Sequence, residues 1–151
     1  MIVRPTERAD LPALQRVLET IELFPADMLP ALIASYLGGE GDDVWLTALA
    51  EGEPVGLLYA ERERASDRAW NMRAIGVSAD AHRTGTGRAL VARLEADLRA
   101  AGQRLLVVDT SSTDGYAAAR AFYRSLDYEE EGRVRDFWTD GDDKVVFRKR
   151  L

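Results

Sequence analysis

The feature that most constrains the fold is a pair of glycines placed directly before a long run of helix-forming residues. Gly85 and Gly87 stand in the stretch HRTGTGRAL, and apolar residues then recur at helical spacing up to Gly102. The residues that follow, RLLVVDT, are apolar on both faces, which is typical of a buried strand. A glycine turn, an amphipathic helix and a buried strand in this order favour an α/β fold.

Three further segments show helical spacing. Asp10 can cap a helix in which leucines and an isoleucine recur on one face, and a second helix is expected over residues 26–37. A third is expected over residues 115–126, with Ala119, Phe122, Tyr123 and Leu126 on one side.

Strand signals fill the spaces between the helices. The runs VWLTALA and VGLLYAERE, joined by EGEP, predict a hairpin, and residues 68–77 predict a third strand. Gly76 near the end of that strand suggests a bulge or a close approach to the backbone. The Asp140-Gly141 pair predicts a turn in a last hairpin. With 151 residues and no linker, we expect one α/β domain over residues 1–151 with a mixed sheet.

Composition excludes several classes of chemistry. The chain has no cysteine, and His82 is its only histidine, which excludes disulfides, thiolate zinc sites and histidine metal clusters, so we expect no metal. A net charge of −6 disfavours a nucleic-acid partner. Because no apolar stretch is long enough for a membrane helix or a signal peptide, we expect a cytoplasmic protein without a membrane partner.

The glycine turn fits some anion sites better than others. A P-loop requires a lysine and a serine or threonine after the glycines, but Arg88 and Ala89 follow here. A dinucleotide-binding turn requires a third small residue where Leu90 stands, although Asp109 after the next strand could bind a ribose. A nucleotide-binding oxidoreductase therefore stays open as one alternative.

The segment AIGVSADAHRTGTGRALVARLEADLRAAG resembles the acetyl-CoA binding segment of the GNAT superfamily of N-acetyltransferases. In the family pattern Gln/Arg-x-x-Gly-x-Gly/Ala, Gly85 and Gly87 match the glycines and His82 replaces the first residue. The resemblance implies that backbone N–H groups of the turn and of the helix start bind the pyrophosphate, as expected for a helix N-terminus.

The downstream segment YAAARAFYRSLDYEEEG is similar to a later helix and strand of the same family. Tyr123 matches the family's tyrosine, whereas Tyr116 stands where many members carry an asparagine that bonds the pantetheine arm. The resemblance implies a GNAT-like acyl-CoA N-acyltransferase fold with a mixed, mostly antiparallel central sheet flanked by helices. It also implies contacts to acetyl-CoA from Ile75, Val77, His82, Arg83, Thr84, Gly85, Thr86, Gly87, Arg88, Tyr116 and Arg120.

Roles in acyl transfer follow from the same resemblance. The backbone N–H of Val77 would bind the oxyanion, and Tyr123 would act as general acid toward the departing thiolate. Without the resemblance, Tyr123 reads as a core aromatic. Asn71 stands where many relatives carry a glutamate, so the base is open: Asp109 ranks first because it ends a strand, and Glu61 and Asp136 are alternatives.

The acceptor is expected to contact Asn71 and Glu22. Acidic residues in the first two helical segments, namely Glu19, Glu22 and Asp27, favour a cationic amine. Trp45, Trp70 and Trp138 are expected to pack in the core, with one of them as a possible wall of the acceptor pocket.

The leading hypothesis is an acetyl-CoA-dependent N-acetyltransferase acting on a primary amine of a small molecule or peptide by direct attack in a ternary complex. The alternative is a non-catalytic acyl-CoA-binding sensor or regulatory module, which the departures at Asn71 and Tyr116 favour. A homodimer is possible by analogy with the family.

Overall fold

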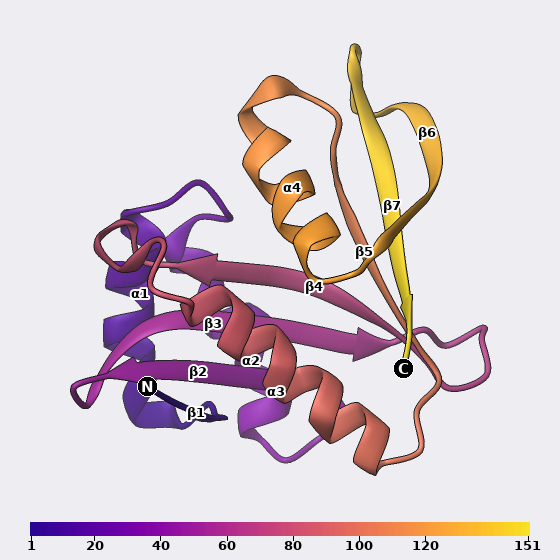
Figure 1. The fold of residues 1–151 in the computed structure, drawn as a ribbon. Coiled ribbons are helices and arrows are strands. Elements are labelled where there is room, and N and C mark those ends of the chain that lie inside the picture. The colour runs from indigo at the N-terminus through magenta and orange to yellow at the C-terminus, as the bar shows by residue number, and fades with distance from the viewer.

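Seven strands form one sheet in the order β1-β2-β3-β4-β5-β7-β6 in the computed structural model, which describes residues 1–151 (Figure 1). The strands are β1 (Ile2–Pro5), β2 (Val44–Ala50), β3 (Glu53–Arg62), β4 (Ala69–Val77), β5 (Leu105–Ser111), β6 (Glu129–Thr139) and β7 (Asp142–Arg150). The helices are α1 (Leu11–Glu19), α2 (Leu29–Leu37), α3 (Thr86–Ala100) and α4 (Ala117–Ser125). None of these helices is long and apolar enough to cross a membrane.

Only β4 and β5 run parallel, and every other neighbouring pair in the sheet is antiparallel. The expected mixed, mostly antiparallel sheet is thus confirmed. The dinucleotide-binding alternative is wrong, because that site requires a parallel sheet with the glycine turn directly after its first strand. Here a 3-10 turn over Ala79–Ala81 separates β4 from the glycines.

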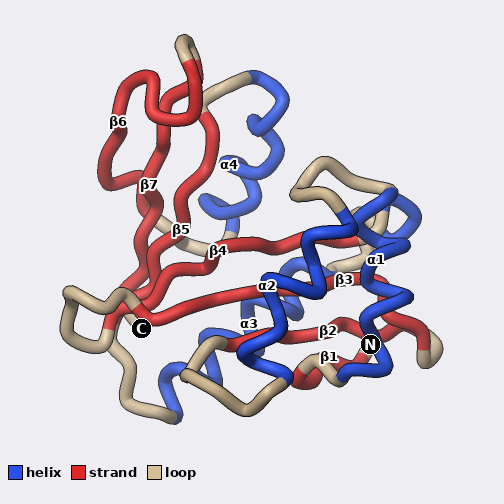
Figure 2. Tube along the Cα trace, turned by 180° about the vertical axis from the view of Figure 1, so that it is seen from behind, coloured by secondary structure: helices blue, strands red, loops and turns tan.

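Helices cover both faces of the sheet. Figures 1 and 2, seen from opposite sides, show α1 and α2 on one face and α3 and α4 on the other. The larger core cluster lies under α3 and α4 and includes Leu90, Leu94 and Phe147. The smaller one lies under α1 and α2 and includes Leu14 and Ile33. Each amphipathic helix therefore buries its apolar face against the sheet, which fixes the position of its ends.

The sheet opens between β4 and β5. These strands pair only over three residues each, 69–71 with 105–107, and then diverge (Figure 1). Beyond this point β5 stays paired with β7 up to the last residue of β5, while β4 stays paired with β3. The opening leaves one edge of β4 without a neighbouring strand, so the backbone groups on that edge need partners other than a strand.

Two local expectations are wrong in part. Asp10 occupies the N-cap position of α1, but its carboxylate accepts hydrogen bonds from Arg4 at 2.7 and 2.8 Å and from the Glu7 N–H at 2.8 Å, so it caps no helical N–H. Gly76 is regularly paired with Leu57, and the bulge of β4 lies before Ala74 instead. A Cβ at Gly76 would lie 2.6 Å from Ile21 Cδ1, which confirms the close approach to the backbone.

The three tryptophans have different environments. Trp45 and Trp70 are buried, as expected, at 1% and 6% exposure. Trp138 is 48% exposed, so its expected place in the core is wrong. It lies in β6, which has a neighbour on one side only, and its indole N–H donates to Thr110 O at 3.2 Å.

Candidate functional site

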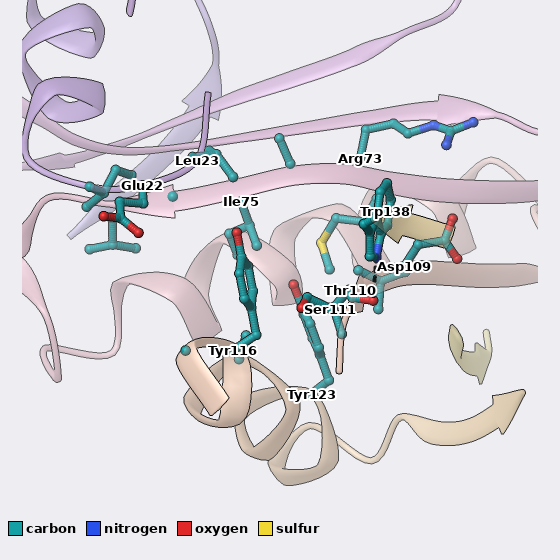
Figure 3. A pocket seen from close by; sticks show the side chains of 18 of the residues that line it. Glu22, Leu23, Arg73, Ile75, Asp109, Thr110, Ser111, Tyr116, Tyr123 and Trp138 are labelled. Atoms are coloured by element: carbon teal, nitrogen blue, oxygen red, sulfur yellow. Dashed lines mark hydrogen bonds between the residues drawn. The ribbon is translucent and has the colours of Figure 1, made fainter. Parts of the chain in front are cut away.

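Two cavities meet where β4 and β5 part. One, about 650 Å³, lies against the glycine turn, the end of β4 and α4; we call it the turn cavity. The other, about 590 Å³, lies between β4 and β5 and reaches the loop after α1; we call it the inner cavity (Figure 3). Both are lined by Ile75, Gly76, Val77, His82, Ala119 and Tyr123. A ligand group held at this shared wall lies next to both cavities.

The end of β4 presents backbone N–H groups to the opening. The N–H of Ser78 donates to Val55 O at the β3 side. Because backbone groups alternate in direction along a strand, the N–H groups of Val77 and Ile75 face the other way, toward the opening. Val77, predicted as the oxyanion-binding residue, therefore has its N–H directed toward the shared wall.

His82 holds the carbonyl beside that N–H. Its Nε2 lies 2.9 Å from Val77 O. A carbonyl oxygen only accepts, so Nε2 carries the proton. The ring thereby fixes the end of β4 relative to the turn, and this contact assigns His82 a positioning role.

The turn leaves a set of N–H groups without acceptors. The first backbone bond of α3 runs from the Ala89 N–H to Gly85 O at 3.0 Å, so the N–H groups of Thr86, Gly87 and Arg88 have no acceptor within the chain. Thr84 is already bonded to Ala81 O and to the buried Thr86 hydroxyl. The free donors at the positive end of the helix dipole suit a phosphate group.

The two glycines serve different purposes. Gly85 adopts φ +84°, in the left-handed region, and a Cβ there would point into open space at the turn cavity. Gly87 instead lies against Phe122, whose Cζ would be 3.1 Å from an added Cβ. Gly85 allows the turn and Gly87 allows α3 to pack beside α4.

The three arginines that are predicted to bind the cofactor lie in different surroundings. Arg83 and Arg88 are exposed, line the turn cavity and make no ion pair within the chain. Arg120 lines neither cavity, because its Nη1 donates to Ser111 O at 2.7 Å and to Thr113 O at 2.8 Å. Arg120 thus ties α4 to the end of β5, and the structure does not bring it to the cofactor site.

Tyr123 projects from α4 toward the opening (Figure 3). The residue is 6% exposed and its ring packs near Phe122 and Phe147, yet its hydroxyl makes no hydrogen bond within the chain. Burial raises the pKa of Tyr123 to about 12. The hydroxyl therefore stays protonated near neutral pH and has its donor capacity free for a ligand.

Asp109 lines the inner cavity, whereas the other two base candidates line neither the inner cavity nor the turn cavity. Its carboxylate accepts from the Asn71 amide at 3.3 Å and lies 3.5 Å from Lys144 Nζ. The alternatives lie elsewhere: Glu61 binds Tyr59 and Arg73, and Asp136 binds the Gly141 N–H. These are the contacts of structural carboxylates.

Asn71 lies behind the cavity wall. It is 3% exposed, and its amide donates to Glu63 at 3.0 Å as well as to Asp109. Its expected contact with the acceptor is not supported by this placement. The contacts make Asn71 a residue that orients Asp109.

The far end of the inner cavity opens into a groove beside the loop after α1. Glu22 lines both spaces, makes no ion pair and lies at the opposite end from Asp109 (Figure 3). Glu19 lines the groove, whereas Asp27 lines neither space. Tyr116 lines the inner cavity and the groove but not the turn cavity, so its placement differs from the one the resemblance implied.

Several wall residues have no signal in the sequence. Arg73, Thr110, Ser111 and Asp142 also line the inner cavity. Arg73 comes from β4, Thr110 and Ser111 come from β5, and Asp142 is the first residue of β7. Periodicity places them in strands but does not show that the sheet opens at this point, so their role could not be predicted. Trp138 also lines the inner cavity, which Trp45 and Trp70 do not; that one tryptophan borders the acceptor pocket stays a prediction.

Comparison with known sequences identifies one family. The profile of the acetyltransferase (GNAT) domain matches residues 41–130, which include the opening between β4 and β5, the glycine turn and Tyr123. The curated proteins give no significant match to this sequence.

Solved structures share the fold over nearly the whole chain. A protein from Desulfovibrio desulfuricans assigned to the GNAT family has a TM-score of 0.91 at 26% identity, with 99% of this chain and 98% of that chain covered. The ribosomal-protein-alanine N-acetyltransferase of Brucella melitensis has a TM-score of 0.79 at 22% identity, with 100% of both chains covered. An aminoglycoside 6'-N-acetyltransferase solved with coenzyme A has a TM-score of 0.71 at 16% identity, with 99% of this chain and 97% of that chain covered. The last two show a common fold alone.

Proposed function

Because this chain belongs to the GNAT family of acetyltransferases, we propose that it transfers the acetyl group of acetyl-CoA directly to a primary amine. The neutral amine attacks the thioester carbonyl, the C–N bond forms, the C–S bond breaks, and the amine loses one proton while the sulfur gains one. No residue is acylated in this scheme. Both substrates are therefore bound together, which requires two binding spaces that share a reaction centre.

The meeting of the two cavities at Ile75, Val77 and Tyr123 is the observation that carries this proposal. CoA would enter by the turn cavity and the amine by the inner cavity. The thioester carbonyl would lie against the Val77 N–H, which stabilises the negative oxygen of the tetrahedral intermediate. The sulfur would lie near the Tyr123 hydroxyl, which donates a hydrogen bond as the thiolate departs.

The turn cavity, proposed as the CoA site, offers the hydrogen-bond donors and positive charges that bind a pyrophosphate. The N–H groups of Thr86, Gly87 and Arg88 would bind the phosphates, and the Arg83 and Arg88 side chains would add charge. These donors need no rearrangement, since the turn already holds them without acceptors. A solved structural neighbour was crystallised with coenzyme A, which agrees with this choice of cosubstrate.

Proton removal from the amine is assigned to Asp109. An alkyl ammonium has a pKa near 10, so a base or an ordered water must take a proton before attack. Asp109 lines the inner cavity and is held by Asn71 and Lys144. It can act directly or through one water.

The acceptor is proposed to carry a second positive charge. Glu22 has no partner within the chain and lies between the inner cavity and the groove, where Glu19 adds a like charge. The neighbours named for ribosomal-protein alanine and for aminoglycosides both act on amines, so the fold accommodates peptides and polycations. An acceptor with one amine at the reaction centre and a cation beside Glu22 suits this arrangement.

Glu22→Gln tests the acceptor assignment. Removing one exposed charge should raise KM for a diamine about two- to five-fold, leave kcat nearly unchanged and reduce the effect of salt on KM. Asp27→Asn is the matched control, since it removes a nearby carboxylate that lines neither space. Equal changes of KM in the two variants would show that the net charge of the protein, and not the position of Glu22, affects acceptor binding.

The proposed activity is tested by following thiol release from acetyl-CoA with a panel of amines, peptides and neutral or anionic controls. We expect release only with amines, matched by an equal amount of acetylated amine in the mass spectrum. CoA binding without release with any acceptor would favour the acyl-CoA-binding module instead.

A further inference from the structure

The loop after α1 rests on β4 at a residue that has no side chain. A Cβ at Gly76 would lie 2.6 Å from Ile21 Cδ1 and 3.0 Å from Leu23 Cδ2. Gly76 pairs with Leu57, and all three of these apolar side chains belong to the cluster under α1 and α2. Because packed atoms do not approach a Cβ so closely, any other residue at position 76 would push the loop away from the sheet.

Few other contacts hold this loop in place. The hydroxyl of Thr20 accepts a hydrogen bond from the Ala79 N–H at 3.2 Å. The N–H groups of residues 22–24 donate no hydrogen bond within the chain. The position of these residues therefore depends on how Ile21 and Leu23 pack against β4.

Glu22 stands between the two residues that meet Gly76. It lines both the inner cavity and the groove, at the end of the cavity away from Asp109 (Figure 3). Since its two neighbours in the chain pack on β4, the distance between the loop and the sheet decides where the Glu22 carboxylate lies relative to the cavity.

A second glycine occupies a similar place on the opposite face of the sheet. Gly56 of β3 pairs with Val77, the neighbour of Gly76. An added Cβ at Gly56 would lie 3.2 Å from Thr86 Cγ2, 3.2 Å from Leu90 Cδ1 and 3.1 Å from Gly76 O. Thr86 is 1% exposed and is the first residue of α3. Gly56 thus lets the start of α3 approach the sheet, as Gly76 does for the loop.

We propose that Gly76 is a positioning residue for the acceptor. Its missing side chain lets the loop after α1 lie close to β4, so that Glu22 can pair with the second charge of a cationic acceptor. This inference rests on the proposed function and adds a determinant of acceptor selectivity in the sheet itself. Gly56 has the corresponding effect on the cofactor turn, so the two glycines control the two substrates separately although they lie on adjacent strands.

Gly76→Ala and Gly56→Ala form a crossed pair of variants. Gly76→Ala should raise KM for diaminobutane about two- to five-fold, the change expected for loss of the Glu22 charge, and change the CoA affinity less than about two-fold. Gly56→Ala should weaken CoA binding about three-fold or more and change that KM less than about two-fold.

Two double variants show whether Gly76 acts through the loop. Ile21→Val removes the Cδ1 atom that the new methyl group would meet, so Gly76→Ala with Ile21→Val should recover much of the wild-type KM. Gly76→Ala with Glu22→Gln should have the KM of Glu22→Gln alone, because there is no longer a charge to displace. A substitution that only destabilised the protein would show neither pattern.

Thiol release gives KM, and calorimetry gives the affinity for CoA and, with CoA bound, for diaminobutane without turnover. Circular dichroism checks the fold of each variant. A wild-type KM in Gly76→Ala, no recovery with Ile21→Val, or multiplied effects of Gly76→Ala and Glu22→Gln would each overturn the role of Gly76 and leave acetyl transfer intact. A wild-type chain that acetylates no amine would overturn the proposed function, and the calorimetric comparison would still decide the role of Gly76.

Discussion

At Tyr123, burial keeps the hydroxyl protonated but also makes it a weaker acid. Burial raises the pKa of its hydroxyl to about 12, well above the pKa near 8.5 of a thiol. The raised value keeps the proton in place at neutral pH, but it also makes full transfer to a thiolate unfavourable. In the proposed reaction the hydroxyl would therefore act mainly by hydrogen bonding to the sulfur as charge develops, and its ionisation should not appear in pH profiles near neutrality.

Asp109→Asn tests the assignment of the base. An amide cannot take a proton, so kcat should fall about 10²-fold or more while CoA affinity stays unchanged. Glu61→Gln is the control, because Glu61 lies outside both cavities and should retain near-normal kcat. Kinetics of thiol release across pH and calorimetry with CoA give the two readouts. A loss of activity in Glu61→Gln with normal turnover in Asp109→Asn would reverse the assignment.

Residue types were easier to predict than residue environments. The sequence indicated Tyr123 and the glycine turn because they match a family pattern, and it indicated Asp109 because that residue ends a strand. It could not show that Arg120 bonds the carbonyls after β5, or that Asn71 lies behind Asp109. Those contacts depend on which strand ends face each other, and spacing along the chain does not carry that information.

At the scale of elements, the start of α3 carries the proposed cofactor site. The left-handed Gly85 ends the turn, and three N–H groups then point to the turn cavity without acceptors. Gly102 has a similar conformation, φ +74°, just after the other end of the same helix, and it lines neither the turn cavity nor the inner cavity. The two glycines thus form a natural pair for comparison.

Gly85→Ala and Gly102→Ala separate binding from stability. Each forces alanine into the left-handed region, so each should lower the unfolding free energy by about 1 kcal/mol. Only Gly85→Ala should weaken CoA binding, by about ten-fold or 1.4 kcal/mol, since its new methyl group points into the phosphate space. Thermal melting and calorimetry measure the two effects. Equal CoA affinities in the two variants would place the phosphates elsewhere.

Element type was predictable from periodicity, and element ends were not. The helix expected over residues 115–126 begins as α4 at Ala117 after a 3-10 turn, and the one expected over 26–37 begins as α2 at Leu29. The close approach at Gly76 was predicted, but the bulge lies before Ala74. Local propensity sets the period, whereas packing against the sheet decides where each element starts.

For the whole molecule, the decisive feature is the separation of β4 from β5. Order of elements and family resemblance predicted the mixed sheet, which the structure confirms. The depth of the opening could not be predicted, and neither could the fact that Trp138, Glu22 and Asp109, which come from distant parts of the chain, line one cavity. That the chain forms one domain over residues 1–151 stays a prediction.

The central claim is that acetyl transfer occurs at this opening, and the steady-state kinetics of Tyr123→Phe test it most directly. Phenylalanine keeps the ring between Phe122 and Phe147 and removes a hydroxyl that bonds nothing in the chain, so stability and CoA affinity should barely change. The measurement is kcat for thiol release at saturating acetyl-CoA. We expect a fall of about ten-fold or more. An unchanged kcat in a folded Tyr123→Phe protein would contradict the assignment of the reaction centre.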